Sequence, residues 1–176
     1  MKHLCFASFV CGALLLNAAD PVLSERGIAR LKKEVRHELV MLPYYGVFDN
    51  LTYAVAPDGQ VTLQGQVTRP TLKTAAEASV KDIEGVIRVA NEIEVLPLSP
   101  NDDSLRLALY RAIYSSNQLN RYALQAVPSI HIIVKNGQAT LEGVAANEAD
   151  KHVAGIQASG VAGVFSVTNN LRLEAK

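Results

Sequence analysis

The sequence predicts an α+β protein built from two copies of one αββαβ unit, each with a three-stranded mixed sheet and its helices on one face. Three observations predict this: an internal repeat, alternating apolar positions around glycine turns, and an amphipathic helix before each copy. Residues 58–95 align without a gap with residues 136–173, and eleven of the 38 pairs are identical. The identical pairs include Gly59/Gly137, Gly65/Gly143, Gly85/Gly163 and Asn91/Asn169.

Each copy begins its sheet with two strands joined by a tight turn. Residues 51–55 and 130–134 alternate between the two faces in the way a half-buried strand requires. The dipeptides Asp58-Gly59 and Asn136-Gly137 favour two-residue hairpin turns, in which both central residues need positive φ. Gly65 interrupts the apolar side of the next strand, which indicates a bulge or the close approach of another backbone.

Two helices complete each unit. The first copy has an apolar stripe over residues 28–42, and the second has one over 105–113 after a cap predicted among Asn101 to Ser104. Thr68 or a neighbour caps the crossover helix, with Pro70 in its first turn. Gly85 and Gly163 end the connection, and residues 87–95 and 165–173 then alternate as a final strand. The predicted boundaries are 24–96 for the first domain, 97–101 for a stiff linker and 102–175 for the second domain.

The N-terminus has the pattern of an export signal. A short basic start precedes an uncharged apolar run from Leu4 to Leu16, and small residues suit cleavage before Asp20. Residues 1–19 are therefore predicted to be a signal peptide, with an uncleaved anchor or a chance apolar start as alternatives. Both cysteines lie in this segment, so the processed chain has no disulfide and no thiol nucleophile. No later stretch is long enough to span a membrane.

Composition argues against nucleic-acid binding. The formal net charge is zero, so no overall field attracts the chain to a polyanion. Residues 160–163 spell the GxxG of a KH module, but they precede a strand and contain no Lys or Arg to meet phosphates.

The repeated strand motifs resemble those of a known family. VTLQGQV at 61–67 followed by GVIRVANEIEV at 85–95 is similar to the BON domain signature, and the second copy repeats it as ATLEGVA and GVFSVTNNLRL. This resemblance implies an exported periplasmic or envelope protein with tandem domains, a role in envelope integrity or osmotic stress, and binding to phospholipid surfaces. Ala139 and Ala145 depart from the pattern, because bulkier β-formers are expected there.

Two surfaces are candidates for lipid binding. Arg26, Arg30 and Lys33 cluster with His37 opposite the apolar stripe of the first helix, where they could meet phosphate headgroups. The alternative is a solvated helix face with i,i+4 ion pairs. The helix of the second copy carries a further candidate set opposite its core stripe, where a contact between domains is the alternative to a membrane interface. The members of this set are Tyr110, Arg111 and Tyr114.

The sequence offers no catalytic residues, no cofactor and no metal site. No G-x-S-x-G, P-loop or H-E-x-x-H motif occurs after residue 19, so the protein is predicted not to be an enzyme. Glu148 and His152, with His131 on a strand, are too few for a metal site and are interpreted as surface residues.

The sequence therefore predicts a non-enzymatic envelope protein whose partner is an anionic phospholipid surface or an envelope protein. The alternative function is a protein- or cell-wall-interaction module without lipid binding. The two differ in salt dependence, because attachment through basic side chains weakens as ionic strength rises.

Overall fold

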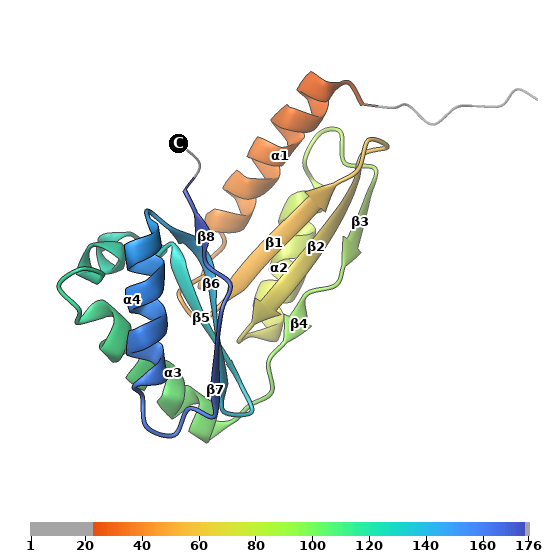
Figure 1. Cartoon of the computed structure of the whole chain (residues 1–176). Coiled ribbons are helices and arrows are strands. Elements are labelled where there is room, and N and C mark those ends of the chain that lie inside the picture. The colour runs from red at the N-terminus through yellow and green to blue at the C-terminus, as the bar shows by residue number, and fades with distance from the viewer. Residues whose placement is uncertain (1–22, 175–176) are drawn as a thin grey trace, which may run out of the picture.

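The computed structural model describes residues 23–174, which form two halves of the same architecture (Figure 1). The predicted signal peptide over residues 1–19 lies outside the described residues. The first half contains α1 (Glu25–Val40), β1 (Asn50–Val55), β2 (Gln60–Val67), α2 (Pro70–Lys81), β3 (Arg88–Asn91) and β4 (Glu94–Val95). The second contains α3 (Pro100–Tyr114), the 3-10 helix η1 (Asn120–Leu124), β5 (Ile130–Lys135), β6 (Gln138–Ala145), α4 (Glu148–Ser159), β7 (Ser166–Asn169) and β8 (Arg172–Leu173).

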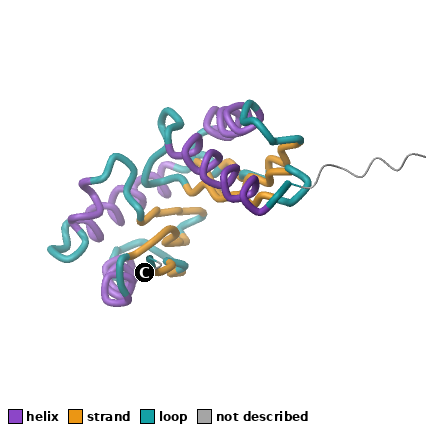
Figure 2. Tube along the Cα trace, turned by 90° about the horizontal axis from the view of Figure 1, so that it is seen from above, coloured by secondary structure: helices purple, strands orange, loops and turns teal. Residues whose placement is uncertain are grey.

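The predicted α+β class is confirmed, with β2 and β6 at the centre of two mixed sheets. β1 pairs antiparallel with β2, and β3 and β4 both pair parallel with it. β5, β7 and β8 repeat this pattern around β6. In Figure 2 the strands of each half run beside that half's helices, in two separate groups.

The predicted final strand of each copy is divided into two short strands. Asn91 causes the break in the first half, because its side-chain oxygen accepts the N–H of Ile93 at 3.2 Å and so turns the backbone. Its amide nitrogen donates to the carbonyl of Lys73 in α2, which ties the turn to the helix. Asn169 makes the matching bonds to Leu171 and Lys151. The repeated asparagine is therefore a structural residue.

The hairpin prediction is confirmed in the second half and wrong in the first. Asn136 and Gly137 have φ of 53° and 74°, as a two-residue turn requires. In the first half Gly59 has positive φ but Asp58 does not, and the N–H of Gly59 bonds to the carbonyl of Ala56. Pro57 precedes Asp58 and suits the second position of this longer turn, because its ring fixes φ near −65°.

The central glycines permit a close backbone approach. A Cβ on Gly65 would lie 2.0 Å from the carbonyl oxygen of Asn50, and one on Gly143 would lie 2.1 Å from that of Ser129. Both residues have φ above 100°, which side chains disfavour. The sequence prediction of a close approach is confirmed, and the approaching backbone is that of the preceding strand.

The last pair of repeated glycines differs from the central pair, because it lies outside the sheets. Gly85 and Gly163 are exposed in the turns that precede β3 and β7, with φ of 97° and 88°. A Cβ on Gly163 would lie 3.3 Å from a side-chain methyl of Leu105, and one on Gly85 would lie 3.8 Å from the guanidinium of Arg30. No backbone atom lies within 4 Å of either Cβ position, so the positive φ of the turn, and not a close backbone approach, favours glycine at both positions.

One predicted helix cap lies elsewhere in the structure, and the other, at Thr68 or a neighbour, makes no side-chain cap bond. α3 begins at Pro100, within the predicted linker, and its cap is Ser99, whose hydroxyl accepts the N–H of Asp102. The first residue before α2 is Arg69, which makes no side-chain cap bond. Thr68 instead donates its hydroxyl to the carboxylate of Asp49, so it is not available to cap the helix.

Each half has its own apolar core between its helices and its sheet. Leu31, Val35 and Leu39 of α1 pack with Val61 and Leu63 of β2 in the first half. The core of the second half also receives side chains of the first, since Val47 and Phe48 pack against it. The two halves are therefore joined by an apolar contact as well as by the chain.

Candidate functional site

The outer face of α1 carries the strongest group of exposed basic side chains predicted from the sequence. Arg26, Arg30 and Lys33 are all exposed, and Ser24 caps the helix that positions them by accepting the N–H of Gly27. The flank toward β1 adds exposed Lys32 and Arg36. We call these five residues the basic face of α1.

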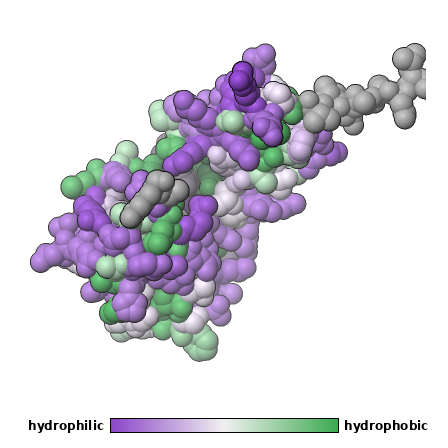
Figure 3. Space-filling view, turned by 45° about the horizontal axis from the view of Figure 1, so that its top comes forward, coloured by the Kyte–Doolittle hydropathy of each residue, from purple (hydrophilic) through white to green (hydrophobic). Residues whose placement is uncertain are grey.

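Two acidic residues of α1 lie on the side of the helix that faces α2. Glu34 and Glu38 line a hollow there together with Arg30, Ser79 and Asp82. The two glutamates are therefore close to Arg30 of the basic face, whereas neither forms an ion pair with Arg26 or Lys33. Figure 3 shows a largely hydrophilic surface around the N-terminal end of α1, with hydrophobic side chains scattered rather than gathered into one large patch.

The three predicted lipid-binding residues of α1 differ in their partners. Arg30 lies 3.6 Å from the carboxylate of Glu34 and 3.5 Å from that of Glu84, so its charge is already engaged. Arg26 and Lys33 have no carboxylate within ion-pair distance among residues 23–174. Arg26 and Lys33 are therefore better placed than Arg30 to meet an anion.

The structure places Tyr110 in the contact between the halves and Tyr114 in the core of the second half, which corrects the premise that both lie on an exposed face. Tyr114 is buried, and its hydroxyl donates to the carbonyl of Ile130 at 2.6 Å. The ring of Tyr110 lies 6.2 Å from that of Phe48 in the first half, edge to face. Arg111 is exposed on α3. A helical wheel could not show the partial burial of Tyr110, because Phe48, which packs on it, comes from the other half.

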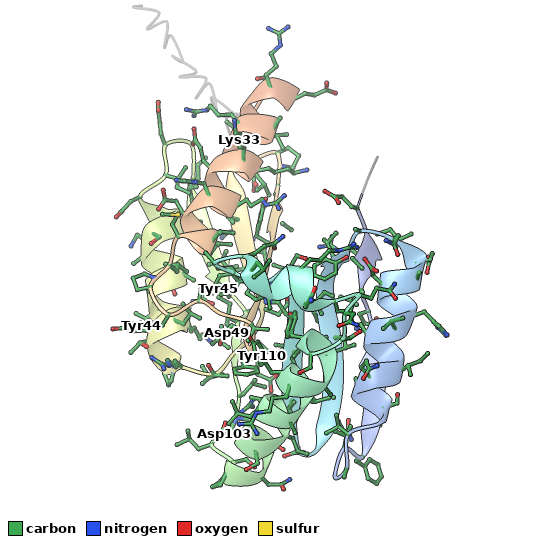
Figure 4. The ribbon with its side chains drawn as sticks, turned by 90° about the vertical axis from the view of Figure 1, so that its left-hand side faces the viewer. Lys33, Tyr44, Tyr45, Asp49, Asp103 and Tyr110 are labelled. Atoms are coloured by element: carbon green, nitrogen blue, oxygen red, sulfur yellow. The ribbon has the colours of Figure 1, made fainter. Side chains whose placement is uncertain are left out.

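This contact is made by the segment 43–48 between α1 and β1, which no pattern used in predicting the site had indicated. Its backbone carbonyl at Val47 accepts the N–H of Ile132 at 2.8 Å, so it bonds along the edge of β5. Its Tyr45 ring stacks on His131 with centroids 5.6 Å apart. In Figure 4, Tyr45 and Asp49 lie near Tyr110, whereas Lys33 lies far from them on α1. Three aromatic residues within five positions, at 44, 45 and 48, were the available signal.

A polar groove of about 350 Å³ separates the outer faces of the two sheets. Gln66 and Glu94 line it from the first half, and Gln138 and Thr140 line it from the second. Lys135 bridges the halves beside it through an ion pair with Glu94 at 2.5 Å.

The described residues show neither a metal cluster nor a membrane helix. No group of three His, Cys, Asp or Glu side chains within 23–174 could hold a metal ion, and the predicted surface residue His131 is in fact buried. No helix over the same range is long and apolar enough to cross a bilayer.

The solved structures that are weakly similar to this chain include two of CdsD, a structural protein of the type III secretion system of Chlamydia trachomatis. The first is 16% identical, covers 82% of this chain and 92% of that one, and has a TM-score of 0.32. The second, its C-terminal domain, is 14% identical, covers 82% and 98%, and has a TM-score of 0.31. Such low scores carry no argument about function. No curated protein matches the chain.

The comparison with family models is decisive. The model described as "BON domain" matches residues 29–97 and 115–175, which together are most of the chain. BON domains are non-catalytic binding domains of periplasmic and envelope proteins. With two matched segments on two αββαβ halves, this chain belongs to the BON domain family as a tandem-BON protein.

Proposed function

We propose that this chain is exported to the cell envelope and binds anionic phospholipid surfaces through the basic face of α1. One observation carries the proposal: α1 exposes Arg26 and Lys33, and neither has a carboxylate within ion-pair distance among residues 23–174. Family membership and the apolar N-terminal run support the location. The bound protein then contributes to envelope integrity or to resistance against osmotic stress, without chemistry.

The expected attachment is weak and electrostatic. A Lys or Arg near an anionic lipid surface contributes about 1 kcal/mol, and salt screens this attraction within about 10 Å at 0.1 M. Arg26 and Lys33 are the main contributors because no carboxylate of the described chain pairs with them. Arg30 contributes less, since Glu34 and Glu84 share its charge.

Co-sedimentation with vesicles tests the proposal. The chain from Asp20 onward, which retains every described residue, is mixed with anionic or zwitterionic vesicles at low and high salt. We expect binding to anionic vesicles alone and release by salt. The double change Arg26→Glu and Lys33→Glu should lower the binding constant at least about tenfold, because it reverses two favourable contributions.

A matched control separates the site from net charge. Lys81→Glu with Arg172→Glu makes the same charge change at exposed positions outside α1 and should change binding less than about twofold. Equal losses in both double variants would show that overall charge rather than α1 governs binding. Absence of binding at low salt would refute the lipid proposal.

The polar groove between the sheets supports the alternative, a protein- or cell-wall-interaction module. Its walls are mainly side-chain amides, a hydroxyl and carboxylates, which suit hydrogen bonding to a polar partner. Thr140→Arg would obstruct this groove and should leave vesicle binding unchanged. A loss of vesicle binding in Thr140→Arg would instead implicate the groove in lipid attachment.

A further inference from the structure

The outer edge of the second sheet is closed by contacts from within the chain. β5 forms this edge, and three of its residues receive a hydrogen bond there. The hydroxyl of Tyr114 donates to the carbonyl of Ile130 at 2.6 Å, and the buried Arg106 donates to that of Val134 at 2.7 Å. The N–H of Ile132 bonds to the loop before β1 at 2.8 Å. Each of the three residues thus has an outward backbone group that is already occupied.

The corresponding edge of the first sheet, β1, is without such contacts in the described chain. Val61 of β2 is equivalent in the repeat to Ala139 of β6, and their partners are Val55 and Val134. The residues of β1 that correspond to Ile130, Ile132 and Val134 are therefore Leu51, Tyr53 and Val55. Backbone groups alternate in direction along a strand, so the N–H groups of Tyr53 and Val55 point outward. Neither bonds to another segment within residues 23–174.

The side chains with which α3 closes β5 have no working counterpart on α1. The two helices bury matching sets of core residues, which are Leu31, Val35 and Leu39 of α1 and Leu105, Leu109 and Ile113 of α3. This match places Lys32 where Arg106 stands and Val40 where Tyr114 stands. The Lys32 side chain is exposed and donates no hydrogen bond in the part of the chain that the structure describes, and valine has no donor. The first sheet therefore keeps an open edge where the second has a closed one.

β1 also lacks the features that normally protect a strand edge. Protected edges are short or broken, or they carry proline or charged residues. The opposite edge of each sheet is of this kind, because it consists of one strand of four residues and one of two. β1 has six residues, and none is charged or proline. Asn50 at its start is buried, but Thr52 and Ala54 are exposed, so an extended segment of another chain can reach this edge.

Two basic side chains of α1 flank the open edge. Lys32 and Arg36 are exposed one turn apart, and neither forms an ion pair among residues 23–174. The hydroxyl of Tyr53 donates to the backbone carbonyl of Lys32 at 2.7 Å, which ties this part of α1 to β1. Burial raises the pKa of Tyr53 and the charge of Arg36 opposes the rise, so Arg36 also lies near the strand. Glu25, about two turns before Lys32, pairs with neither.

We propose that the open edge of β1 binds an extended acidic segment of a partner protein as an added strand. The backbone of Tyr53 and Val55 pairs with this segment, and Lys32 and Arg36 favour carboxylates at alternate positions along it. A second copy of this chain fits less well, because pairing two β1 edges would bring the Lys32 and Arg36 side chains of both copies together. The proposal does not depend on lipid binding, although Lys32 and Arg36 belong to the basic face of α1.

Amide hydrogen exchange by NMR first tests whether the edge is open. In the chain from Asp20 onward, the N–H groups of Tyr53 and Val55 should exchange at least about tenfold faster than those of Thr52 and Ala54, which point toward β2. Equal protection of the two pairs would show that the edge is already covered, and it would overturn the proposal.

A synthetic peptide then serves as the probe. It has about six residues, the usual length of a strand, alternates glutamate with threonine and is capped at both ends. At ten times its Kd it should raise the protection of Tyr53 and Val55 about tenfold, whereas a peptide with lysine in place of glutamate should have less than about a twofold effect at that concentration. No protection by the glutamate peptide, or equal protection by both, would overturn the proposal. Protection that rises with protein concentration alone would overturn it in favour of a second copy.

A proline variant separates strand pairing from attraction by charge alone. Val55→Pro removes an outward N–H, a change that an edge strand tolerates, and should abolish the peptide's effect on Tyr53. Val55→Ala keeps that N–H and should bind the peptide as the unchanged chain does. Both variants should still bind anionic vesicles, so a failure of the peptide test is distinguishable from a failure of the lipid proposal. Undiminished peptide binding by Val55→Pro would show that no strand is added at β1.

A charge reversal covers the case in which Val55→Pro fails to fold. Lys32→Glu with Arg36→Glu should reverse the preference, so that the lysine peptide protects Tyr53 and the glutamate peptide does not. Lys81→Glu with Arg172→Glu makes the same change in net charge at exposed positions away from β1 and should keep the original preference. A preference for glutamate that survives the reversal at Lys32 and Arg36 would overturn the proposal.

Discussion

The two halves have the same backbone architecture but bury different kinds of side chain between helix and sheet. One helix position shows this best. Position 72 of α2 and position 150 of α4 are equivalent in the repeat. Leu72 is 2% exposed within the apolar core of the first half. Asp150 is 1% exposed in the second half, so a carboxylate is buried where the first half buries a leucine.

The connection before the sheet explains the difference. Residues 115–129 of the second half are longer than residues 41–49 of the first and contain η1. Tyr122 of η1 donates to Asp150 at 2.5 Å, Gln118 donates at 2.8 Å, and Arg121 forms an ion pair with it. Asp150 thus ties a long connection to α4, which the shorter connection of the first half does not require.

The β5–β6 hairpin of the second half and the β1–β2 hairpin of the first also differ, because only the former is held by a buried carboxylate. In the second half the buried carboxylate of Asp102 accepts the N–H groups of Asn136 and Gly137, at 2.9 and 2.8 Å. In the first half a backbone bond from Leu23 to Pro57 joins the same two regions. The comparison teaches that a repeated fold tolerates a buried charge where a local donor set satisfies it.

The largest effect is expected from moving the charge into the half that lacks those donors. Leu72→Asp should destabilise the first half by about 4 kcal/mol or more, because it buries an unpaired carboxylate and leaves a cavity. Urea denaturation followed by circular dichroism measures the loss. Thr71→Asp adds the same charge at an exposed position of the same turn and should change stability by less than about 0.5 kcal/mol. Equal losses of stability in Leu72→Asp and Thr71→Asp would show that any negative charge in the first turn of α2 is destabilising, whether buried or exposed.

Removing the charge from the second half should have the next largest effect. Asp150→Ala leaves the donors on Tyr122, Gln118 and Arg121 without their acceptor and should cost about 3 kcal/mol of unfolding free energy. Glu148→Ala, an exposed change in the same first turn, is the control. If the two variants were equally stable, the Asp150 network would contribute nothing.

Acid should weaken the hydrogen bonds and the ion pair of Asp150 without a mutation, because it protonates the carboxylate. Burial alone would raise the pKa of Asp150, but the bonds from Tyr122 and Gln118 and the charge of Arg121 lower it overall. A lowered pKa contributes stability that is present above the ordinary aspartate pKa and is lost as pH falls through the lowered one. Urea midpoints from pH 5 to pH 2 should therefore fall more steeply for the unchanged chain than for Asp150→Ala. Parallel slopes would contradict the assigned role.

The smallest expected effect is the difference in stability between alanine variants of the two hairpin glycines, Gly59 and Gly137. Both have positive φ, so an alanine at either costs about 1 kcal/mol from backbone strain. A Cβ at Gly59 would also lie 2.7 Å from the carbonyl of Gly85, whereas the nearest contact at Gly137 is 3.9 Å. Thermal unfolding should show Gly59→Ala to be less stable than Gly137→Ala by about 1 to 2 kcal/mol. The reverse order would mean that the longer first turn relaxes more readily.

Much of the fold could be predicted from residues alone because it depends on short-range patterns. The repeat, the helix stripes and the close approach at Gly65 follow from periodicity and from the glycine side chain. The Asp58 turn was predicted wrongly because the pattern Asp-Gly does not reveal that Pro57 extends the turn. The break at Asn91 was missed because alternation continues on both sides of it.

The candidate site was predictable only in part. Arg26, Arg30 and Lys33 do share an exposed face, since helix geometry fixes that from spacing. The i,i+4 ion pair of Arg30 with Glu34 belongs to the alternative that spacing had predicted. The second partner of Arg30, Glu84, could not be predicted because it comes from a distant loop. The burial of Tyr114, Asp150 and His131 likewise depends on segments far away in the chain.

The sequence by itself determined the two αββαβ units, their glycine positions and the basic stripe, because each of these depends on neighbours within a few residues. Only the tertiary structure decided which surfaces remain free. Residues 43–48 cover Tyr110 and His131 because packing between the halves buries side chains across a sequence separation that no local pattern records. The same packing leaves the basic face of α1 exposed to a partner.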